Sequence, residues 1–284
     1  MTKTPILLAY ALLLGLSVWA VEPLNLAMLP TTRNLGVSPW WAPKNFWLDR
    51  IGRQREAIQQ SGGTFDLVLI GDSITHNWEG WPDEQWQEIL KAHPWAKDSL
   101  PSGNNPGAEA LADLRRDYSV LNLGIGGDTT GDVLWRLRYA RQLEGYRALC
   151  VCLMICTNNR EEPAAIAEGV GEILREIRAR QPEAVVLLLP IFPRGETPAD
   201  KHRVRNTAVN AIIRGLADGQ RVLWVDFSKR FLREDGTLTR TMMPDLLHPG
   251  PEGYRIWAEE LRPYLEKICK TNLKDKQQRK DGEK

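Results

Sequence analysis

Short apolar runs alternate with amphipathic stretches along most of the chain. Five runs are nearly continuous and rich in Val, Leu and Ile, which is typical of strands buried on both faces of a sheet. They cover residues 65–70, 119–123, 148–155, 184–191 and 221–227. Helical spacing of apolar positions is found over residues 46–60, 83–91, 108–116, 132–143, 164–180, 204–217 and 254–267. This alternation predicts an α/β domain with a parallel sheet, helices on both faces and right-handed crossovers.

The two ends of the chain do not follow this pattern. Lys3, the apolar run that follows it and the small residues before Val21 predict a signal peptide over residues 1–20. An uncleaved membrane anchor is the alternative, although the run is short for a bilayer. After cleavage no stable membrane span is expected. Residues 21–63 are interpreted as a Trp-rich extension, residues 64–269 as the main domain, and residues 270–284 as a disordered tail.

Composition and charge exclude some classes of protein. The chain has 284 residues, of which 43% are hydrophobic and 26% charged, as is ordinary for a globular protein. Its formal net charge of +1 provides no basic field for phosphates, so a nucleic-acid partner is not expected.

The four cysteines are interpreted as thiols rather than as a metal site, because no histidine or acid lies at ligand spacing. Cys150, Cys152 and Cys156 share one parity of a strand and are expected on one buried face. Export would permit a disulfide, so a bridge between Cys150 and Cys269 is left open.

Residues with candidate chemistry follow three successive predicted strands. Ser73 comes directly after residues 65–70, a glycine-rich segment at 124–130 follows the second strand, and Asn158 follows the third. Because working sites in parallel sheets lie at the carboxyl ends of the strands, these residues are expected to meet at one edge. Taken alone, Gly-Asp-Ser could equally be a turn with a helix cap.

Asp245 and His248 stand three residues apart in a segment bracketed by Pro244 and Pro249. That spacing lets the carboxylate bind one ring nitrogen while the other nitrogen faces a substrate. We therefore predict that Ser73 is a nucleophile, His248 its general base and Asp245 the group that orients the base.

Acyl transfer also requires hydrogen-bond donors for the negative charge that develops on the carbonyl oxygen. The predicted donors are the backbone N–H groups of Ser73 and Gly127 and the side-chain amide of Asn158. The Gly127 segment can also begin a helix with Asp128 or Thr129 as cap, and the two interpretations are compatible. A phosphate-binding loop is disfavoured, because neither the dinucleotide pattern nor the Lys-Ser/Thr pattern is present.

Gly71-Asp72-Ser73, the Gly127 loop, Thr157-Asn158 and Asp245-x-x-His248 resemble, in this order, the four sequence blocks of the SGNH (GDSL) hydrolase superfamily. Residues 121–130, 133–137, 157–159 and 189–196 are similar to the catalytic subunits of brain-type platelet-activating-factor acetylhydrolases. The resemblance implies a flavodoxin-like, three-layer α/β/α sandwich with a five-stranded parallel sheet. It also implies the catalytic and oxyanion residues named above and no metal or other cofactor.

The chain departs from the family pattern at two places. Cys156 stands where the block that contains Asn158 normally begins with glycine, and its side chain can narrow the pocket or shift this loop. The segment between Ser73 and Gly127 is longer than in the acetylhydrolase subunits, and the extra residues, about 92–110, have a loop signature.

Tryptophan is concentrated near the predicted nucleophile. His76, Trp78 and Trp81 follow Ser73 closely and are predicted to line the substrate pocket, because a tryptophan face suits a sugar ring. The alternative is that the tryptophans pack the amino-terminal extension onto the sheet.

Together with export, the tryptophans predict a secreted or periplasmic esterase that removes short acyl groups, above all acetyl, from a carbohydrate or glycoconjugate. A lipid-directed acetylhydrolase or lysophospholipase is the alternative enzyme. A catalytically silent glycan-binding protein is the alternative of another class. The motifs do not indicate an oligomeric state.

Overall fold

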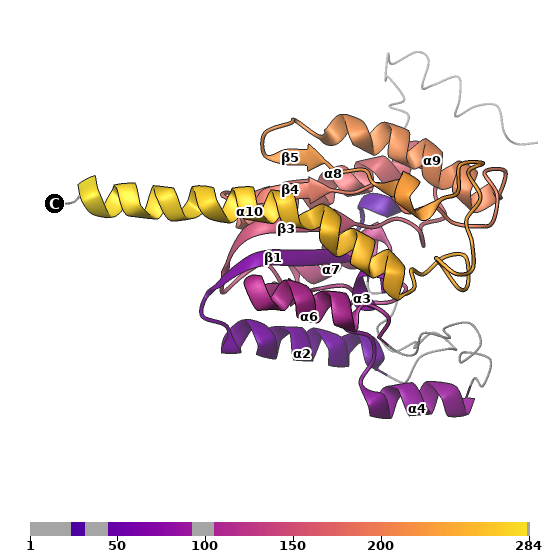
Figure 1. Ribbon diagram of the computed structural model, residues 1–284, viewed down its shortest axis with the longest axis horizontal. Helices are drawn as coiled ribbons and strands as arrows, with labels where there is room; N and C mark the ends of the chain where they lie inside the picture. Colours follow the sequence, from indigo (N-terminus) through magenta and orange to yellow (C-terminus); the bar gives the residue numbers. More distant parts are fainter. Residues whose placement is uncertain (1–23, 32–44, 93–104, 283–284) are drawn as a thin grey trace, which may run out of the picture.

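The computed structural model of the protein describes residues 24–31, 45–92 and 105–282. The predicted signal peptide and most of the predicted loop at residues 92–110 lie outside these ranges. Within them, helices flank both faces of one parallel sheet of five strands (Figure 1). The strands are β1 (Thr64–Gly71), β2 (Val120–Asn122), β3 (Arg147–Met154), β4 (Val185–Leu188) and β5 (Val222–Trp224). The α/β sandwich expected from the sequence is thereby confirmed.

The strand order is β2-β1-β3-β4-β5. The connection that leaves β1 therefore runs to one side of the sheet, and the connection that leaves β3 runs to the other side. Leu69 of β1 pairs with Asn122 of β2 on one side and with Cys152 of β3 on the other. This is the flavodoxin-like order, in which ligands bind beyond the carboxyl ends of the strands where the order reverses. Ser73 and Asn158, which follow β1 and β3, lie at this position.

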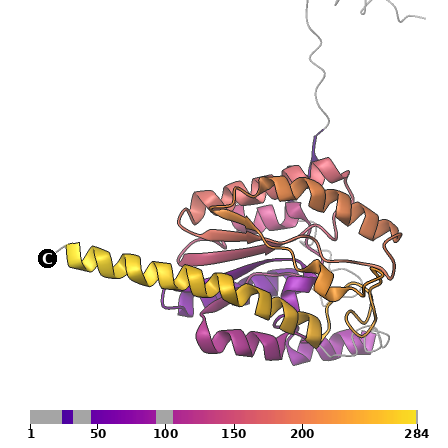
Figure 2. The same cartoon turned by 45° about the horizontal axis from the view of Figure 1, so that its top comes forward.

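Successive residues of β1 face opposite layers of the core, as the geometry of a strand requires. Val68 and Ile70 pack with one helical layer, whereas Leu67 and Leu69 pack with the other, and all four are fully buried. The first layer consists of α7 (Thr130–Arg138), α8 (Pro163–Arg180) and α9 (Lys201–Ile213), and the second contains α6 (Ala108–Asp117) and α10 (Pro251–Gly282). Figure 2 shows the sheet between these layers. The remaining short elements are η1 (Leu26–Met28), α3 (Ser73–His76), α4 (Asp83–Ala92), η2 (Arg214–Leu216) and η3 (Ser228–Phe231).

Helix α2 (Phe46–Gln60) belongs to the predicted amino-terminal extension but is tied to the sheet. Phe46, Trp47 and Ile51 are buried, and polar side chains of the same helix bind the segment that follows β2. The Arg50 Nε donates to the carbonyl oxygen of Gly124 at 2.7 Å, and the Gln54 amide donates to that of Asn122 at 3.2 Å. These bonds from α2 hold the start of the glycine-rich loop in place.

The last helix is longer than the sequence pattern predicts. α10 continues through residue 282, so residues 270–282, predicted to be a disordered tail, are helical and project beyond the sheet (Figures 1 and 2). Lys, Gln and Arg, which are frequent in this segment, have good helix propensity, so a helix already anchored in the core can extend past the sheet. No helix in the described parts of the chain is both long and apolar enough to cross a membrane.

All four cysteines are free thiols, so the bridge left open between Cys150 and Cys269 is not formed. Cys150 and Cys152 pack in the layer of α6 and α10, as predicted for residues two positions apart in a strand. Cys156 packs in the opposite layer, which corrects the expectation of one shared face. The reason is that β3 ends at Met154, and strand alternation no longer applies beyond that residue.

Candidate active site

Ser73 occupies the turn between β1 and α3. The Asp72 carboxylate caps this helix by accepting from the Ile74 backbone N–H at 3.0 Å. A side chain at Gly71 would collide with Thr75 and with the backbone of Met154, so the turn requires glycine there. Asp72 and Ile74 are buried, whereas Ser73 is partly exposed. The turn thus presents the Ser73 hydroxyl at the carboxyl edge of the sheet.

Ser73, His248 and Asp245 form a continuous chain of hydrogen bonds. The distance from Ser73 Oγ to His248 Nε2 is 2.8 Å, and that from His248 Nδ1 to Asp245 Oδ2 is 2.6 Å. Both distances are within the range required for proton transfer. The structure therefore brings together the three predicted residues over 175 positions of sequence in the geometry of a nucleophile, a base and an orienting acid.

The turn that carries Asp245 and His248 is held by its own hydrogen bonds. Asp245 Oδ1 accepts from the backbone N–H groups of Leu247 at 3.0 Å and His248 at 2.7 Å. Burial alone would raise the pKa of Asp245, but the hydrogen bonds and charge of His248 and the Leu247 N–H outweigh it, so the pKa is lowered. Asp245 is consequently ionised at neutral pH and can stabilise a protonated His248.

The three predicted oxyanion donors lie on three different loops. Ser73, Gly127 and Asn158 are partly exposed, although the residues on either side of each are buried. Gly127 has a φ of 83°, a conformation that favours glycine. The Asn158 amide donates one hydrogen to the carbonyl oxygen of Asp128 at 3.0 Å. This bond fixes the amide against the Gly127 loop, and its second hydrogen remains for a substrate oxygen.

A buried network beneath the Gly127 loop was not predicted from the sequence. The Asp128 carboxylate accepts from Trp47 Nε1 at 2.7 Å and from Arg136 Nε at 2.8 Å, and all three side chains are fully buried. Arg136 also donates to Gln142, which binds Gln54 at 2.5 Å. Burial raises the pKa of Asp128 to about 7, against the opposing charge of Arg136. No local signal identifies this network, since α2, the glycine-rich loop and α7 meet only in the fold.

Cys156, which replaces the family glycine, keeps the backbone conformation of a glycine. Its φ is 105°, which side chains rarely adopt, and its thiol is buried. Asn158 nevertheless reaches the Gly127 loop, so the side chain at Cys156 does not remove the amide from the site.

The predicted pocket residues His76, Trp78 and Trp81 are buried, which corrects their predicted role. His76 Nδ1 accepts from the Gly126 backbone N–H at 3.3 Å, and its ring centroid is 4.7 Å from that of Trp81. Trp78 packs on Tyr254, with ring centroids 5.0 Å apart. Burial, followed by nearby arginines, lowers the pKa of His76 well below its usual value. Trp81 packs against Phe46 of α2, as the alternative interpretation for the tryptophans proposed, whereas Trp78 packs against α10 and not against the amino-terminal extension.

Two arginines beside the site carried no prediction from the sequence. Arg194 Nη1 donates to the Thr157 carbonyl oxygen at 3.3 Å and to its hydroxyl at 3.4 Å. Arg205 donates to the carbonyl oxygens of Thr157 at 3.0 Å and Asn159 at 2.5 Å. The signal that could have identified Arg194 is its position beyond β4, at the same sheet edge as the predicted residues.

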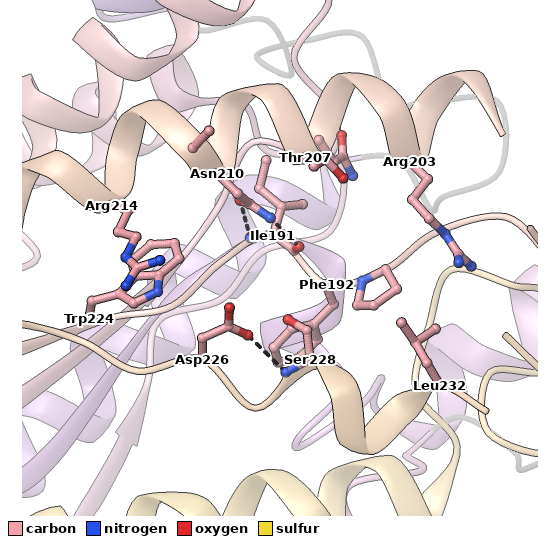
Figure 3. A pocket seen from close by; sticks show the side chains of 13 residues that line it. Ile191, Phe192, Arg203, Thr207, Asn210, Arg214, Trp224, Asp226, Ser228 and Leu232 are labelled. Carbon is pink, nitrogen blue, oxygen red and sulfur yellow. Dashed lines mark hydrogen bonds between the residues drawn. The ribbon is translucent and has the colours of Figure 1, made fainter. Parts of the chain in front are cut away.

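A cavity of about 320 Å³ lies between α9 and the segments that follow β4 and β5 (Figure 3). Its wall includes Trp224, Asp226 and the residues that lead to Arg194. Asn210 binds both backbone groups of Ile191 in this wall, at 2.8 and 2.9 Å. Among the described residues, those that line the cavity do not include the triad, so it is a separate hollow beside the site.

Comparison with known families agrees with this geometry. The profile of the GDSL-like lipase/acylhydrolase family matches residues 69–256, which is more than half of the chain. The protein belongs to this family. It is accordingly an ester-hydrolysing enzyme of the SGNH type, and the resemblance stated from the sequence blocks is confirmed.

Curated relatives include platelet-activating factor acetylhydrolase IB subunits. Subunit alpha2 of Rattus norvegicus is 34% identical over 171 residues, which cover 60% of this chain and 74% of the relative. Subunit alpha1 of Bos taurus is 38% identical over 159 residues, or 55% and 68% of the two chains. Among solved structures, an acetylxylan esterase from Geobacillus stearothermophilus shares the fold, with a TM-score of 0.50, 19% identity, and coverage of 73% of this chain and 94% of that chain.

Proposed function

We propose that the protein is a serine esterase that removes short acyl groups, above all acetyl, from a carbohydrate or glycoconjugate. The observation that carries the proposal is the hydrogen-bonded chain from Ser73 through His248 to Asp245, with Gly127 and Asn158 beside it. The acetyl preference is supported by similarity to platelet-activating factor acetylhydrolase subunits and by the fold shared with an acetylxylan esterase.

The reaction that we propose has two steps. His248 Nε2 accepts the Ser73 proton as Ser73 Oγ attacks the ester carbonyl, and the donors at Ser73, Gly127 and Asn158 stabilise the tetrahedral oxyanion. His248 then protonates the leaving alcohol, which leaves an acyl-enzyme. In the second step His248 deprotonates a water molecule, which attacks the acyl-enzyme and releases the acid and Ser73.

Support for a carbohydrate alcohol comes from two sources. The signal-like segment at residues 1–20 favours a secreted or periplasmic enzyme, where polymeric glycans are accessible. Two polar groups border the triad: the Asn158 amide, which is held against the Gly127 loop, and the Arg194 guanidinium, whose charge acts on Asp245. The tryptophan argument no longer contributes, because Trp78 and Trp81 are buried.

A lipid-directed acetylhydrolase is the second candidate, favoured by the 34–38% identity to the acetylhydrolase subunits. Acetate release from an O-acetylated sugar and from an acetylated glycerophospholipid, with Ser73→Ala beside the wild type, separates the candidates. A carbohydrate acetylesterase prefers the sugar ester and loses its turnover in the variant. A preference for the phospholipid would favour the lipid-directed enzyme, and turnover by folded Ser73→Ala would refute the assigned nucleophile.

The binding-only alternative has its own test. A fluorophosphonate reagent modifies a serine only if the hydroxyl is activated by a base. We expect covalent labelling of the wild type at Ser73 and none in Ser73→Ala. A folded wild type that stays unlabelled would indicate a protein that has kept the fold and lost turnover.

A further inference from the structure

Arg194 lies between the two halves of the candidate active site. The backbone N–H of the next residue, Gly195, donates to the carbonyl oxygen of Leu246 at 2.9 Å, within the turn that carries Asp245 and His248. On the other side, the Arg194 guanidinium contacts Thr157, the residue before Asn158. Arg194 lies in the loop that follows β4. This loop is bound to the turn that carries His248, and the Arg194 side chain is bound to the loop that carries Asn158.

Arg194 forms no direct ion pair in the described parts of the chain, although Asp200, Asp245 and Asp72 act on its charge at longer range. No carboxylate of these residues lies within 4.0 Å of it, and its contacts are two neutral oxygens of Thr157 at 3.3 and 3.4 Å. Only Nη1 takes part in these bonds. The nearby Asp200 carboxylate caps α9 through the N–H groups of His202 and Arg203. Asp245 is bound to His248.

Burial and a neighbouring cation make the positive charge of Arg194 less favourable. The Arg194 side chain is half-buried, and burial and the neighbouring Arg205 lower its pKa by more than the charges of Asp200, Asp245 and Asp72 raise it. Arg194 and Arg205 donate to the same carbonyl oxygen of Thr157, so two guanidinium groups lie close together. A partly buried cation beside another cation is stabilised by an anion, and the planar guanidinium is suited to bind carboxylate or phosphate.

We propose that Arg194 binds a carboxylate on the alcohol part of the ester, so that the enzyme prefers acetyl esters of acidic sugars. This inference rests on the proposed function and names its substrate class. A sugar carboxylate placed against Arg194 leaves the acetyl group to reach Ser73, because Arg194 borders both the triad turn and the Asn158 loop. The Nε and Nη2 hydrogens of Arg194, which have no protein acceptor among the described residues, are available for it.

Arg205 provides a matched control, because its hydrogen bonds serve the loop. It donates to the carbonyl oxygens on either side of Asn158, at Thr157 and at Asn159. We expect Arg205→Gln to misplace the Asn158 amide and to lower turnover of charged and neutral esters by a similar factor. Arg194→Gln removes a substrate contact and should therefore change the selectivity.

The experiment compares acetate release from O-acetylated methyl glucuronoside with release from the corresponding uncharged glucuronamide. The wild type is expected to favour the acidic sugar by at least about tenfold in kcat/KM, and added salt should reduce this preference. Arg194→Gln should lower the acidic-to-neutral ratio by about 10- to 100-fold, mainly through KM, as expected for lost charge-assisted hydrogen bonds. Arg194→Lys should retain part of the ratio, and Arg205→Gln should leave the ratio unchanged.

Three results would overturn the inference. The first is a wild type that hydrolyses both sugars equally well. The second is an equal loss on both sugars in Arg194→Gln, which would make Arg194 a positioning residue like Arg205. The third is a stronger, Arg194-dependent preference for an acetylated glycerophospholipid, which would assign the anion to a phosphate. By contrast, absence of Ser73-dependent hydrolysis of p-nitrophenyl acetate would refute the proposed function itself.

Discussion

Trp47 provides a sharp test of whether α2 is part of the catalytic domain. Its indole N–H donates to the Asp128 carboxylate at 2.7 Å, and the Asp128 carbonyl oxygen in turn accepts from the Asn158 amide at 3.0 Å. Trp47→Phe removes the donor and keeps an aromatic ring in the fully buried site. The change should therefore destabilise the fold and also loosen the Asn158 amide, the proposed oxyanion donor.

The expected magnitude follows from the two parts of the change. Loss of a hydrogen bond to a charged, buried group should lower the free energy of unfolding by about 1.5–3 kcal/mol. The smaller ring adds a cavity penalty. Trp78→Phe is the matched control, because Trp78 is equally buried but its indole N–H has no partner among the described residues. The difference between the two variants should isolate the hydrogen bond, at about 3–12 °C in Tm for a chain of this size.

The assay is urea and thermal unfolding of wild type and both variants at pH 6 and pH 8, with kcat for p-nitrophenyl acetate measured in parallel. The hydrogen bond from Trp47 lowers the pKa of Asp128, which burial has raised to about 7. The carboxylate is more fully ionised at pH 8, so the loss in Trp47→Phe should be larger at pH 8 than at pH 6. Equal destabilisation of Trp47→Phe and Trp78→Phe at both pH values, or an unchanged kcat in Trp47→Phe, would refute this account.

Two further predictions concern the loops beside Ser73 and Asn158. Burial raises the pKa of Asp72 from 3.8 to about 6, so between these values the folded state binds more protons than the unfolded state and stability falls as the pH rises. This group alone should remove about 2 kcal/mol between pH 4 and pH 7, and Asp72→Asn should abolish that decrease in urea unfolding; equal slopes in both proteins would contradict it. At Cys156, where φ is 105°, Cys156→Gly should stay within about 1 kcal/mol of wild type in stability. Cys156→Val should lose about 1–3 kcal/mol, because a branched side chain crowds the buried position, and similar unfolding midpoints for the two variants would show that neither conformation nor space matters there.

The layered fold could be predicted because its signals are local. The residues of β1 are apolar on both faces, and helix α2 begins and ends where its periodicity does. The ends of strands were less predictable. β5 spans Val222–Trp224, whereas the apolar run extends to residue 227. The last backbone bond to β4 is donated by Val225, and Phe227 remains buried beyond it. Burial and strand pairing are different properties, and the hydrophobic pattern predicts only burial.

Short motifs and the order of the strands were enough to predict the parallel sheet, the edge at which the chemistry would lie, and Ser73, Asp245 and His248 as candidates. The way in which the loops are supported depends on contacts that form only in the folded chain. Trp47 and Asp128 are 81 residues apart, and no spacing rule connects them. Trp78 and Trp81 follow the nucleophile in a segment without strand or helix periodicity, so the sequence indicates their aromatic character but not whether they face substrate or core. The direction of such a side chain is set by what the rest of the chain packs against it.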